Sequence, residues 1–208
     1  MKGRDIMKRI ITISRECGSG GHIIAEKLSK ELGIPLYDRE IIEMTAKKSG
    51  LTTDFVQESN ERITNSILFN IANSMTYANQ VFTSGNVSMV DQVFFIQCDI
   101  IKKVANDSPC IIVGRCADYI LRERDDCLNV FIHADKEYRK ERFAKLNNIS
   151  EKEAESVIKK RDKSRQNYYR YYTDKEWGNM KNYALALDSK VLGNDMCAEL
   201  ILKAYKEL

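Results

Sequence analysis

A glycine-rich turn near the N-terminus of this 208-residue chain has the residue types that suit phosphate binding. The stretch "ISRECGSGGHIIAEKLSKELGIP" (13–35) begins where a β-branched apolar run ends, and it continues into a helical pattern. Backbone N–H groups at the start of a helix, together with the helix dipole, favour a bound anion. Glycines let the backbone approach a phosphate closely. The turn therefore predicts a phosphate site, and a tight turn without chemistry is the alternative.

The turn departs from the full phosphate-loop signature, G-x-x-x-x-G-K-[ST]. Arg15 takes the first glycine position, Gly21 the lysine position and His22 the hydroxyl position, while Gly20 keeps the second glycine. We expect Arg15 to supply part of the missing charge and arginines further along the chain to supply the rest. A lysine introduced at position 21 should partly rescue a variant that lacks one of those arginines, if the first helical turn has room for it. The predicted contacts to ATP phosphates are Arg15, Gly18, Ser19, Gly20, Gly21 and His22.

Arg115 is the first candidate for binding a second phosphate-bearing molecule. It directly follows the apolar run "CIIVG" (110–114), and ligands of open α/β sheets bind beyond the carboxyl ends of the strands. A guanidinium bonds two phosphate oxygens at once and keeps its charge. Asp118, about one helical turn further on, is expected to orient Arg115 or to touch the same molecule. The alternatives are a surface ion pair for Arg115 and an ordinary helical position for Asp118.

Two further pairs of arginines stand at helical spacing. Arg139 lies three residues before Arg142, and Arg161 lies four residues before Arg165, so each pair shares one helical face. Arginines that close over phosphates would neutralise charge during phosphoryl transfer, whereas a charged face exposed to solvent is the alternative. The tyrosines in "QNYYRYYTDKEW" (166–177) suit either stacking on nucleic acid or packing of the helix, and we favour packing.

The elements that position these residues alternate between strands and helices, which predicts a parallel sheet covered on both faces. Gly33 suits a helix C-cap, and Ser150 with Glu153 forms a capping box. Asp38 suits the N-cap of the helix that begins at Arg39. The expected strands are 9–14, 35–38, 110–114, 127–134 and 183–189. The expected helices are 21–33, 39–49, 53–59, 85–106, 116–122, 135–147, 150–171 and 193–207.

Composition narrows the class of protein. Lys and Arg total 33 against 30 Asp and Glu, and a net charge of +3 does not by itself indicate a nucleic-acid binder. No apolar run approaches about 18 residues, so we expect no membrane span, and the N-terminus lacks the pattern of a signal peptide. The six cysteines form no CxxC pair, which predicts reduced thiols in a cytoplasmic protein, with Cys17 as a candidate reactive thiol. Met1 and Met7 both remain possible starts.

Four segments together resemble the cytidylate-kinase-like family: "ITISRECGSGGHIIAEKLSKELGIPLYDREII", "CIIVGRCADYIL", "VFIHADKEYRKERF" and "IKKRDKSRQNYYRYYTDKEWGNMKNYALALDSKVLG". The resemblance implies a P-loop NTPase-type three-layer α/β/α sandwich with a parallel sheet. It implies a single domain over residues 1–208, with a helical acceptor-binding insertion at about 39–105 and a helical lid at about 135–172.

The resemblance also implies an activity, namely phosphoryl transfer from ATP with Mg²⁺ to a nucleoside monophosphate (CMP-like) or a related small phosphorylated acceptor. By resemblance Arg139, Arg161 and Arg165 are the catalytic lid arginines. The predicted acceptor contacts are Asp38, Arg39, Arg115 and Asp118. Arg39 replaces a serine of the cytidylate kinase pattern, and Met44 falls where that pattern has an arginine, so the acceptor stays open, as do the metal ligands.

Two other functions fit the same residues. The missing loop lysine favours a nucleotide-binding regulatory protein without turnover, and the basic helical segment fits an RNA-binding module, against which the small net charge argues. We expect no nucleic-acid and no membrane partner. The apolar stretch "SILFNIANSMTYANQVF" (66–82) suits a core, a face of the acceptor site or the surface of a homodimer.

Overall fold

A computed structural model describes residues 10–61 and 88–207 of the chain. Its centre is one sheet of five parallel strands in the order β2-β3-β1-β4-β5. The strands are β1 (Ile10–Arg15), β2 (Leu36–Tyr37), β3 (Cys110–Val113), β4 (Cys127–His133) and β5 (Leu185–Asp188). Each predicted strand is confirmed in place, and the order adds what the sequence left undetermined.

Helices connect the strands and cover both faces of the sheet. The first helices are α1 (Gly21–Leu32), α2 (Arg39–Ser49), α3 (Thr53–Glu61), α6 (Met89–Asp107) and α7 (Ala117–Ile120). The later ones are α8 (Lys136–Asn147), α9 (Glu151–Thr173), a 3₁₀ turn (Met180–Asn182) and α10 (Ser189–Glu207). The predicted stretch 66–82 and both candidate start residues lie outside the residues that the structure describes.

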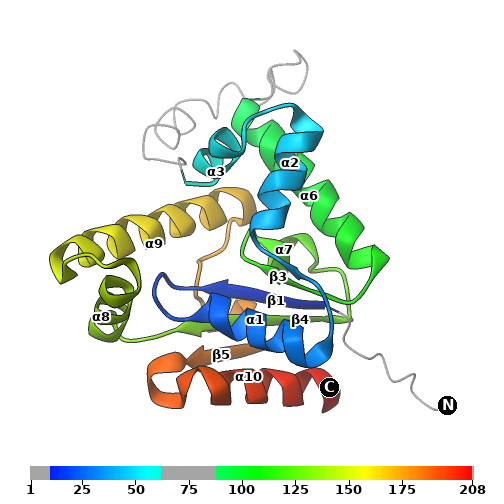
Figure 1. Cartoon of the computed structure of the whole chain (residues 1–208). Coiled ribbons are helices and arrows are strands. Elements are labelled where there is room, and N and C mark those ends of the chain that lie inside the picture. Colours follow the sequence, from blue (N-terminus) through cyan, green and yellow to red (C-terminus); the bar gives the residue numbers. More distant parts are fainter. Residues whose placement is uncertain (1–9, 62–87, 208) are drawn as a thin grey trace.

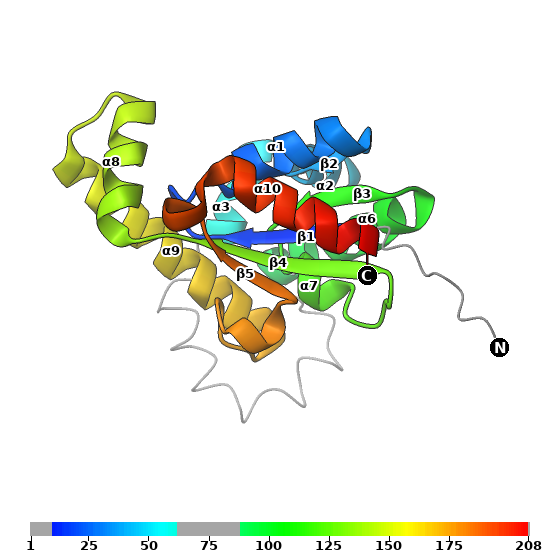
Figure 2. The same ribbon diagram turned by 90° about the horizontal axis from the view of Figure 1, so that it is seen from below.

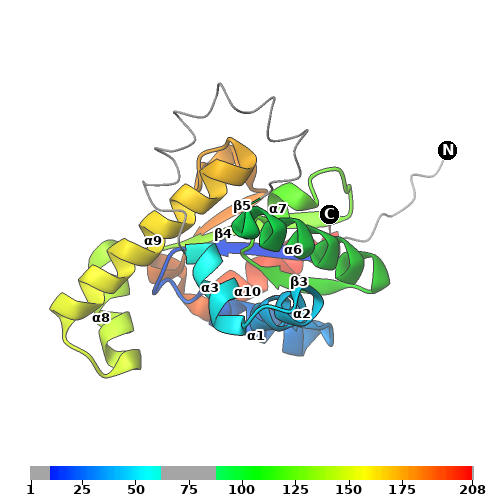
Figure 3. The ribbon, with the colours of Figure 1, turned by 90° about the horizontal axis from the view of Figure 1, so that it is seen from above.

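Alternation along the strands divides the core between the two faces of the sheet. Ile11 and Ile13 of β1 pack with Ile24 of α1 and Ile201 of α10, whereas Ile10 packs on the side of α6 and α7. Figure 1 shows α1 and α10 on one side of the sheet and α6 and α7 on the other; Figure 2 views the first layer face-on and Figure 3 the second. The predicted three-layer α/β/α sandwich is therefore confirmed.

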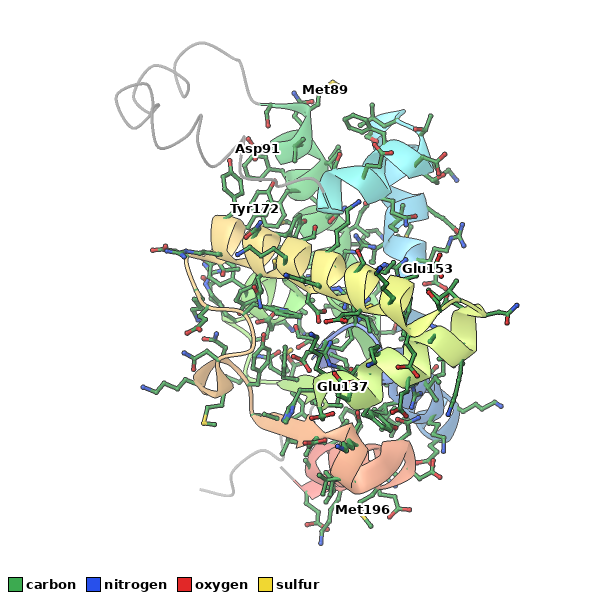
Figure 4. The ribbon with its side chains drawn as sticks, turned by 90° about the vertical axis from the view of Figure 1, so that its left-hand side faces the viewer. Met89, Asp91, Glu137, Glu153, Tyr172 and Met196 are labelled. Carbon is green, nitrogen blue, oxygen red and sulfur yellow. The ribbon has the colours of Figure 1, made fainter. Side chains whose placement is uncertain are left out.

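Tyrosines at the C-terminal end of α9 pack that helix against α6, as the sequence predicts. The rings of Tyr172 and Phe94 stack with centroids 3.6 Å apart, and the Tyr172 hydroxyl donates to Asp91 at 3.1 Å (Figure 4). Tyr168 is buried, and its hydroxyl donates to the buried Gln97. Figure 3 shows that the other end of α9 extends with α8 to one side of the sheet. One end of this helical hairpin is thus held in the core.

The caps agree with the sequence at some helix ends and differ at others. Gly33 ends α1 with φ 65°, and Ser150 with Glu153 forms the predicted capping box at α9. A short helical turn begins at Ser189, where the carboxylate of Asp188 accepts from the amide of Lys190, and it precedes the predicted helix. Gly193, with φ 74° and ψ 163°, is not helical and separates the two parts of α10, so the second part begins next to the predicted start at 193.

All six cysteines lie in the described ranges and are unpaired, as predicted. Among the helices of residues 10–61 and 88–207, none has both the length and the apolar character needed to cross a membrane.

Candidate functional site

A cavity of about 340 Å³ lies where the carboxyl ends of β1 and β3 face α2 and α9. Its polar lining is dominated by guanidinium groups, those of Arg15, Arg39, Arg115, Arg161 and Arg165. Asp38 is the one carboxylate among its described lining residues, and Tyr168, Tyr169 and Trp177 supply aromatic walls. The arrangement suits a ligand that carries several negative charges and a flat apolar part.

The glycine loop follows Arg15, which is the only one of the six predicted phosphate contacts among the described lining residues of the cavity. Gly18 and Gly20 adopt the left-handed conformation, with φ 83° and 87°. In the described part of the chain, no acceptor binds the amides of Gly21 and His22, which open α1. Such unpaired amides at a helix N-terminus form an anion site. The backbone geometry therefore supports the predicted phosphate loop.

The condition set for a lysine at position 21, room in the first helical turn, is not met while Arg15 is present. A Cβ added to Gly21 would lie 2.6 Å from Cβ and 2.9 Å from Cγ of Arg15. The Arg15 side chain then runs to Gly114, where its guanidinium occupies the space of any added Cβ. Arg15 and a residue larger than glycine at position 21 thus exclude one another.

Arg15 lies in a positively charged environment. Its nearest anion is Asp38, with Nη2 and Oδ1 3.6 Å apart, and Arg165 donates from Nη1 to the Arg15 carbonyl at 3.0 Å. Burial, followed by the nearby charge of Arg165, lowers the pKa of Arg15 to about 9, against the attraction of Asp38. The group stays charged at neutral pH, and a bound phosphate would stabilise it.

Asp38 occupies the N-cap position of α2, as predicted, but its side chain does not cap the helix. The carboxylate instead faces Arg15 and His22, whose Nδ1 lies 3.0 Å from Asp38 Oδ2. Tertiary partners with positive or donor groups therefore replace the local cap. In the residues that the structure describes, no three His, Cys, Asp or Glu side chains cluster as a metal site. Mg²⁺ often takes only one or two carboxylates beside phosphate oxygens and waters, and Asp38 fits that role.

The turn after β3 holds Arg115 at the cavity through a costly backbone conformation. Arg115 and Cys116 have φ values of 60° and 54°, in the left-handed region that residues other than glycine rarely adopt. Each such residue costs about 1–3 kcal/mol, and these conformations concentrate at functional sites. Arg115 lines the cavity together with Gly114.

Asp118, a predicted acceptor contact, lies behind the cavity wall and does not line it. Its side chain is buried, and its Oδ2 accepts from the hydroxyl of Tyr169 at 2.6 Å. Burial raises the pKa of the Asp118 carboxyl, although the hydrogen bond from Tyr169 opposes this shift. Asp118 therefore reaches the cavity only through Tyr169, which lines it.

Helix α9 brings two of the three predicted lid arginines to the cavity. Arg161 and Arg165, one turn apart, both line it. Asp162 lies between them and faces the loop: its Oδ1 accepts from the amide of Cys17 at 2.7 Å. Its Oδ2 accepts from Nη1 of Arg139, also at 2.7 Å. The helix is thus joined directly to the glycine loop.

Arg139, the third predicted lid arginine, is committed to the protein itself. Its side chain is buried and donates to the carbonyls of Ala134 and Cys17 at 2.9 and 3.0 Å. It also pairs with Glu16 at 3.2 Å and with Asp162. This guanidinium does not line the cavity, and it holds the loop against α8 and α9.

Two loop neighbours were not among the predicted site residues. A Cβ on Gly20 would lie 2.6 Å from Oδ1 of Asn194 and 3.0 Å from Nη2 of Arg142. The Asn194 oxygen is buried and has no hydrogen-bond partner in the described part of the protein. Arg142 follows Arg139 at helical spacing, which was a usable signal, whereas Asn194 gave none.

The candidate thiol, Cys17, is buried, and burial raises its pKa, so a reactive thiolate is not favoured.

The sequence model of the cytidylate kinase-like family matches residues 10–191 of this chain. The chain belongs to the cytidylate kinase-like family. A search of curated proteins gave no significant match. Among solved structures, an uncharacterized protein from Eubacterium ventriosum ATCC 27560 is 26% identical, with a TM-score of 0.71, covering 96% of this chain and 99% of the other.

Solved structures of two kinases share the fold of this cytidylate kinase-like protein at low sequence identity. Shikimate kinase from Bacteroides thetaiotaomicron is 13% identical, with a TM-score of 0.53 and coverage of 96% and 98% of the two chains. A gluconokinase from Sinorhizobium meliloti 1021 is 12% identical, with a TM-score of 0.50 and coverage of 94% of each chain. The fold is that of P-loop kinases, and family and fold together support phosphoryl transfer from ATP in general.

Replacing Arg139 should destabilise this family member strongly. Arg139→Ala leaves the carboxylates of Asp162 and Glu16 without their buried partner, so we expect the free energy of unfolding to fall by about 3–5 kcal/mol. Urea denaturation measures the change. The matched control is Lys163→Ala on the exposed face of α9, for which about 0.5 kcal/mol or less is expected. Equal effects of the two variants would contradict the anchoring role.

Asp118→Asn should change how stability depends on pH. Because burial raises the pKa of Asp118, the folded protein holds this proton to a higher pH than the unfolded chain. Its contribution to stability therefore declines as pH rises from the ordinary carboxyl value of about 3.9 through the raised one. The amide introduced by Asp118→Asn loses no proton. The thermal midpoint of the variant minus that of the wild type should therefore be larger at pH 7 than at pH 4. A difference that stays constant between pH 4 and pH 7 would contradict this account.

Proposed function

We propose that this protein transfers the γ-phosphoryl group of ATP to a small phosphorylated acceptor, with nucleoside monophosphates such as CMP as the first class to test. The observation that carries the proposal is the cavity itself, in which five arginines meet beside a glycine loop with free amides. This concentration of positive charge suits two phosphate-bearing molecules joined by a transferring group.

The donor side is the glycine loop. The amides of Gly21 and His22 would hold the phosphates, and Arg15 would supply charge beyond the half unit of the helix dipole. Arg142 and Asn194, beside Gly20, extend this side toward α8 and α10. When bound, Mg²⁺ would neutralise phosphate oxygens, and Asp38 is the described cavity carboxylate that would hold it.

The acceptor side is formed by Arg115 and the start of α2. Arg39 stands at the rim of the cavity with its side chain largely exposed, free to approach an anionic group. Met44 packs against the core, so no cation stands where cytidylate kinases have an arginine. The acceptor clamp therefore differs from that of cytidylate kinases. The aromatic walls of Tyr169 and Trp177 suit a flat ring on the acceptor.

The arginines of α9 serve the transferring group, and Arg139 serves the loop. Arg161 and Arg165 line the cavity from α9, and they would neutralise the charge that develops on the transferring phosphoryl group. Arg139 is assigned a positioning role, because its buried guanidinium is held by the carbonyls of Ala134 and Cys17 and by the carboxylate of Asp162. No general base is needed if the acceptor is a phosphate anion.

A nucleotide-binding regulator without turnover is the second candidate function. The observation that favours it is the loop itself, which lacks the lysine and already gives the Cys17 amide to the carboxylate of Asp162. Incubation with Mg·ATP and each nucleoside monophosphate, followed by mass detection of products, separates the two. A phosphorylated product supports the kinase, whereas ATP binding with no product from nucleoside monophosphates and other small phosphorylated acceptors supports the regulator.

Removing a lid arginine should affect turnover far more than ATP affinity. Arg161→Ala should reduce kcat/KM by a transition-state loss of about 2–4 kcal/mol, because a charge-neutralising donor is lost. Arg165→Ala should do at least as much, since Arg165 also bonds the Arg15 carbonyl. Steady-state kinetics and ATP titration measure the effects, with Lys163→Ala as the control on the same helix. Normal turnover in both arginine variants would show that this face of α9 is only a solvated charged surface.

Arg115 should bind the acceptor and not ATP. Arg115→Ala removes the guanidinium at the carboxyl end of β3, so the KM for the acceptor should rise by about 10-fold or more while ATP affinity stays nearly unchanged. The control is Arg122→Ala, an exposed arginine just beyond α7 that does not line the cavity. A loss of ATP affinity in Arg115→Ala would place the residue on the donor side.

A further inference from the structure

We propose that Arg15 and Gly21 represent one exchange within the phosphate-loop motif. The cation of the loop stands at the first position, as Arg15, and a glycine stands at the seventh position, where the motif has its lysine. Arg15 stands at the first glycine of G-x-x-x-x-G-K-[ST], and Gly21 stands at its lysine. The inference rests on the proposed function for its chemistry. It goes further by assigning Arg15 as the loop cation that contacts the donor phosphates.

Gly21 is not required by its own backbone. Its φ is not among the positive values of the described glycines, and it is the first residue of α1, where any residue can stand. What forbids a side chain there is Arg15, whose Cβ and Cγ lie 2.6 and 2.9 Å from the position of an added Cβ. The next atom is Cβ of Ile132 at 3.5 Å, an ordinary contact. Removing the Arg15 side chain alone would therefore make room at position 21.

The guanidinium of Arg15 has its own prepared path. It lies against Gly114, where an added Cβ would collide with Nη1, and the left-handed φ of 73° at Gly114 also favours glycine. The Arg15 side chain thus lies between two glycines, with its Cβ and Cγ beside Gly21 and its guanidinium beside Gly114.

The position of the guanidinium favours contact with phosphate. Arg15 lines the cavity at the end of β1, beside the loop amides, with Arg115 and Arg165 nearby. Asp38 is its one observed anionic partner among the described residues, and the distance of 3.6 Å is longer than a hydrogen bond. A phosphate oxygen would give this group the charge-assisted hydrogen bond that the observed pair does not reach.

The exchange is tested by moving the cation back. The variants are Arg15→Gly, Gly21→Ala, and the doubles Arg15→Gly/Gly21→Ala and Arg15→Gly/Gly21→Lys, the last of which restores the complete motif up to its hydroxyl position. Gly21→Ala should lower the thermal midpoint in the wild-type background and not in the Arg15→Gly background. Arg15→Gly should lower turnover about 10²–10³-fold. Arg15→Gly/Gly21→Lys should recover at least about tenfold of that loss, and the matched alanine double should recover none.

Three measurements keep the outcomes distinct: the thermal midpoint, the affinity for Mg·ATP by calorimetry, and phosphoryl transfer. If the wild type binds Mg·ATP and transfers phosphate to nothing, the proposed function fails, and recovery of Mg·ATP affinity by lysine but not alanine still decides the exchange. Equal destabilisation by Gly21→Ala in both backgrounds would overturn the steric half of the inference. Equal behaviour of the lysine and alanine doubles in affinity and turnover would overturn the charge half.

Discussion

The room for one Cβ between positions 15 and 21 is the constraint on which the rest of the site depends. With Arg15 present, position 21 must be glycine and the loop can have no lysine. The long Arg15 side chain then lies against Gly114 at the end of the neighbouring strand, and the Asp38 carboxylate faces Arg15 and His22 and does not cap α2. A steric rule within one turn thus extends to three strand ends and to both sides of the cavity.

The second organising feature is the attachment of α9 at two points. Asp162 joins α9 to the Cys17 amide and to Arg139, while Tyr172 holds the C-terminal end of the same helix on α6. These contacts position Arg161 and Arg165 at the cavity. Phosphoryl transfer depends on alignment and charge neutralisation, and arginines held in this way suit both needs.

The sequence predicted those features that neighbouring residues determine. β-branched runs gave the strands, and Ser150 with Glu153 gave the start of α9. Strand order, the loss of the Asp38 cap and the inward turn of Arg139 depend on partners far along the chain, so spacing did not predict them. The absence of room for a lysine at position 21 follows from a distance between two side-chain positions, which only coordinates supply. The roles assigned to the site residues stay predictions, because each is defined by contacts to a ligand.

A crystal structure with Mg²⁺ and a non-hydrolysable ATP analogue would test the central claim most directly. The account predicts phosphate oxygens within hydrogen-bond distance of the Gly21 and His22 amides and of the Arg15 guanidinium, with the Arg15 side chain still occupying the space beside Gly21. A triphosphate bound away from the loop, or bound to the loop amides while Arg15 contacts only Asp38, would contradict it.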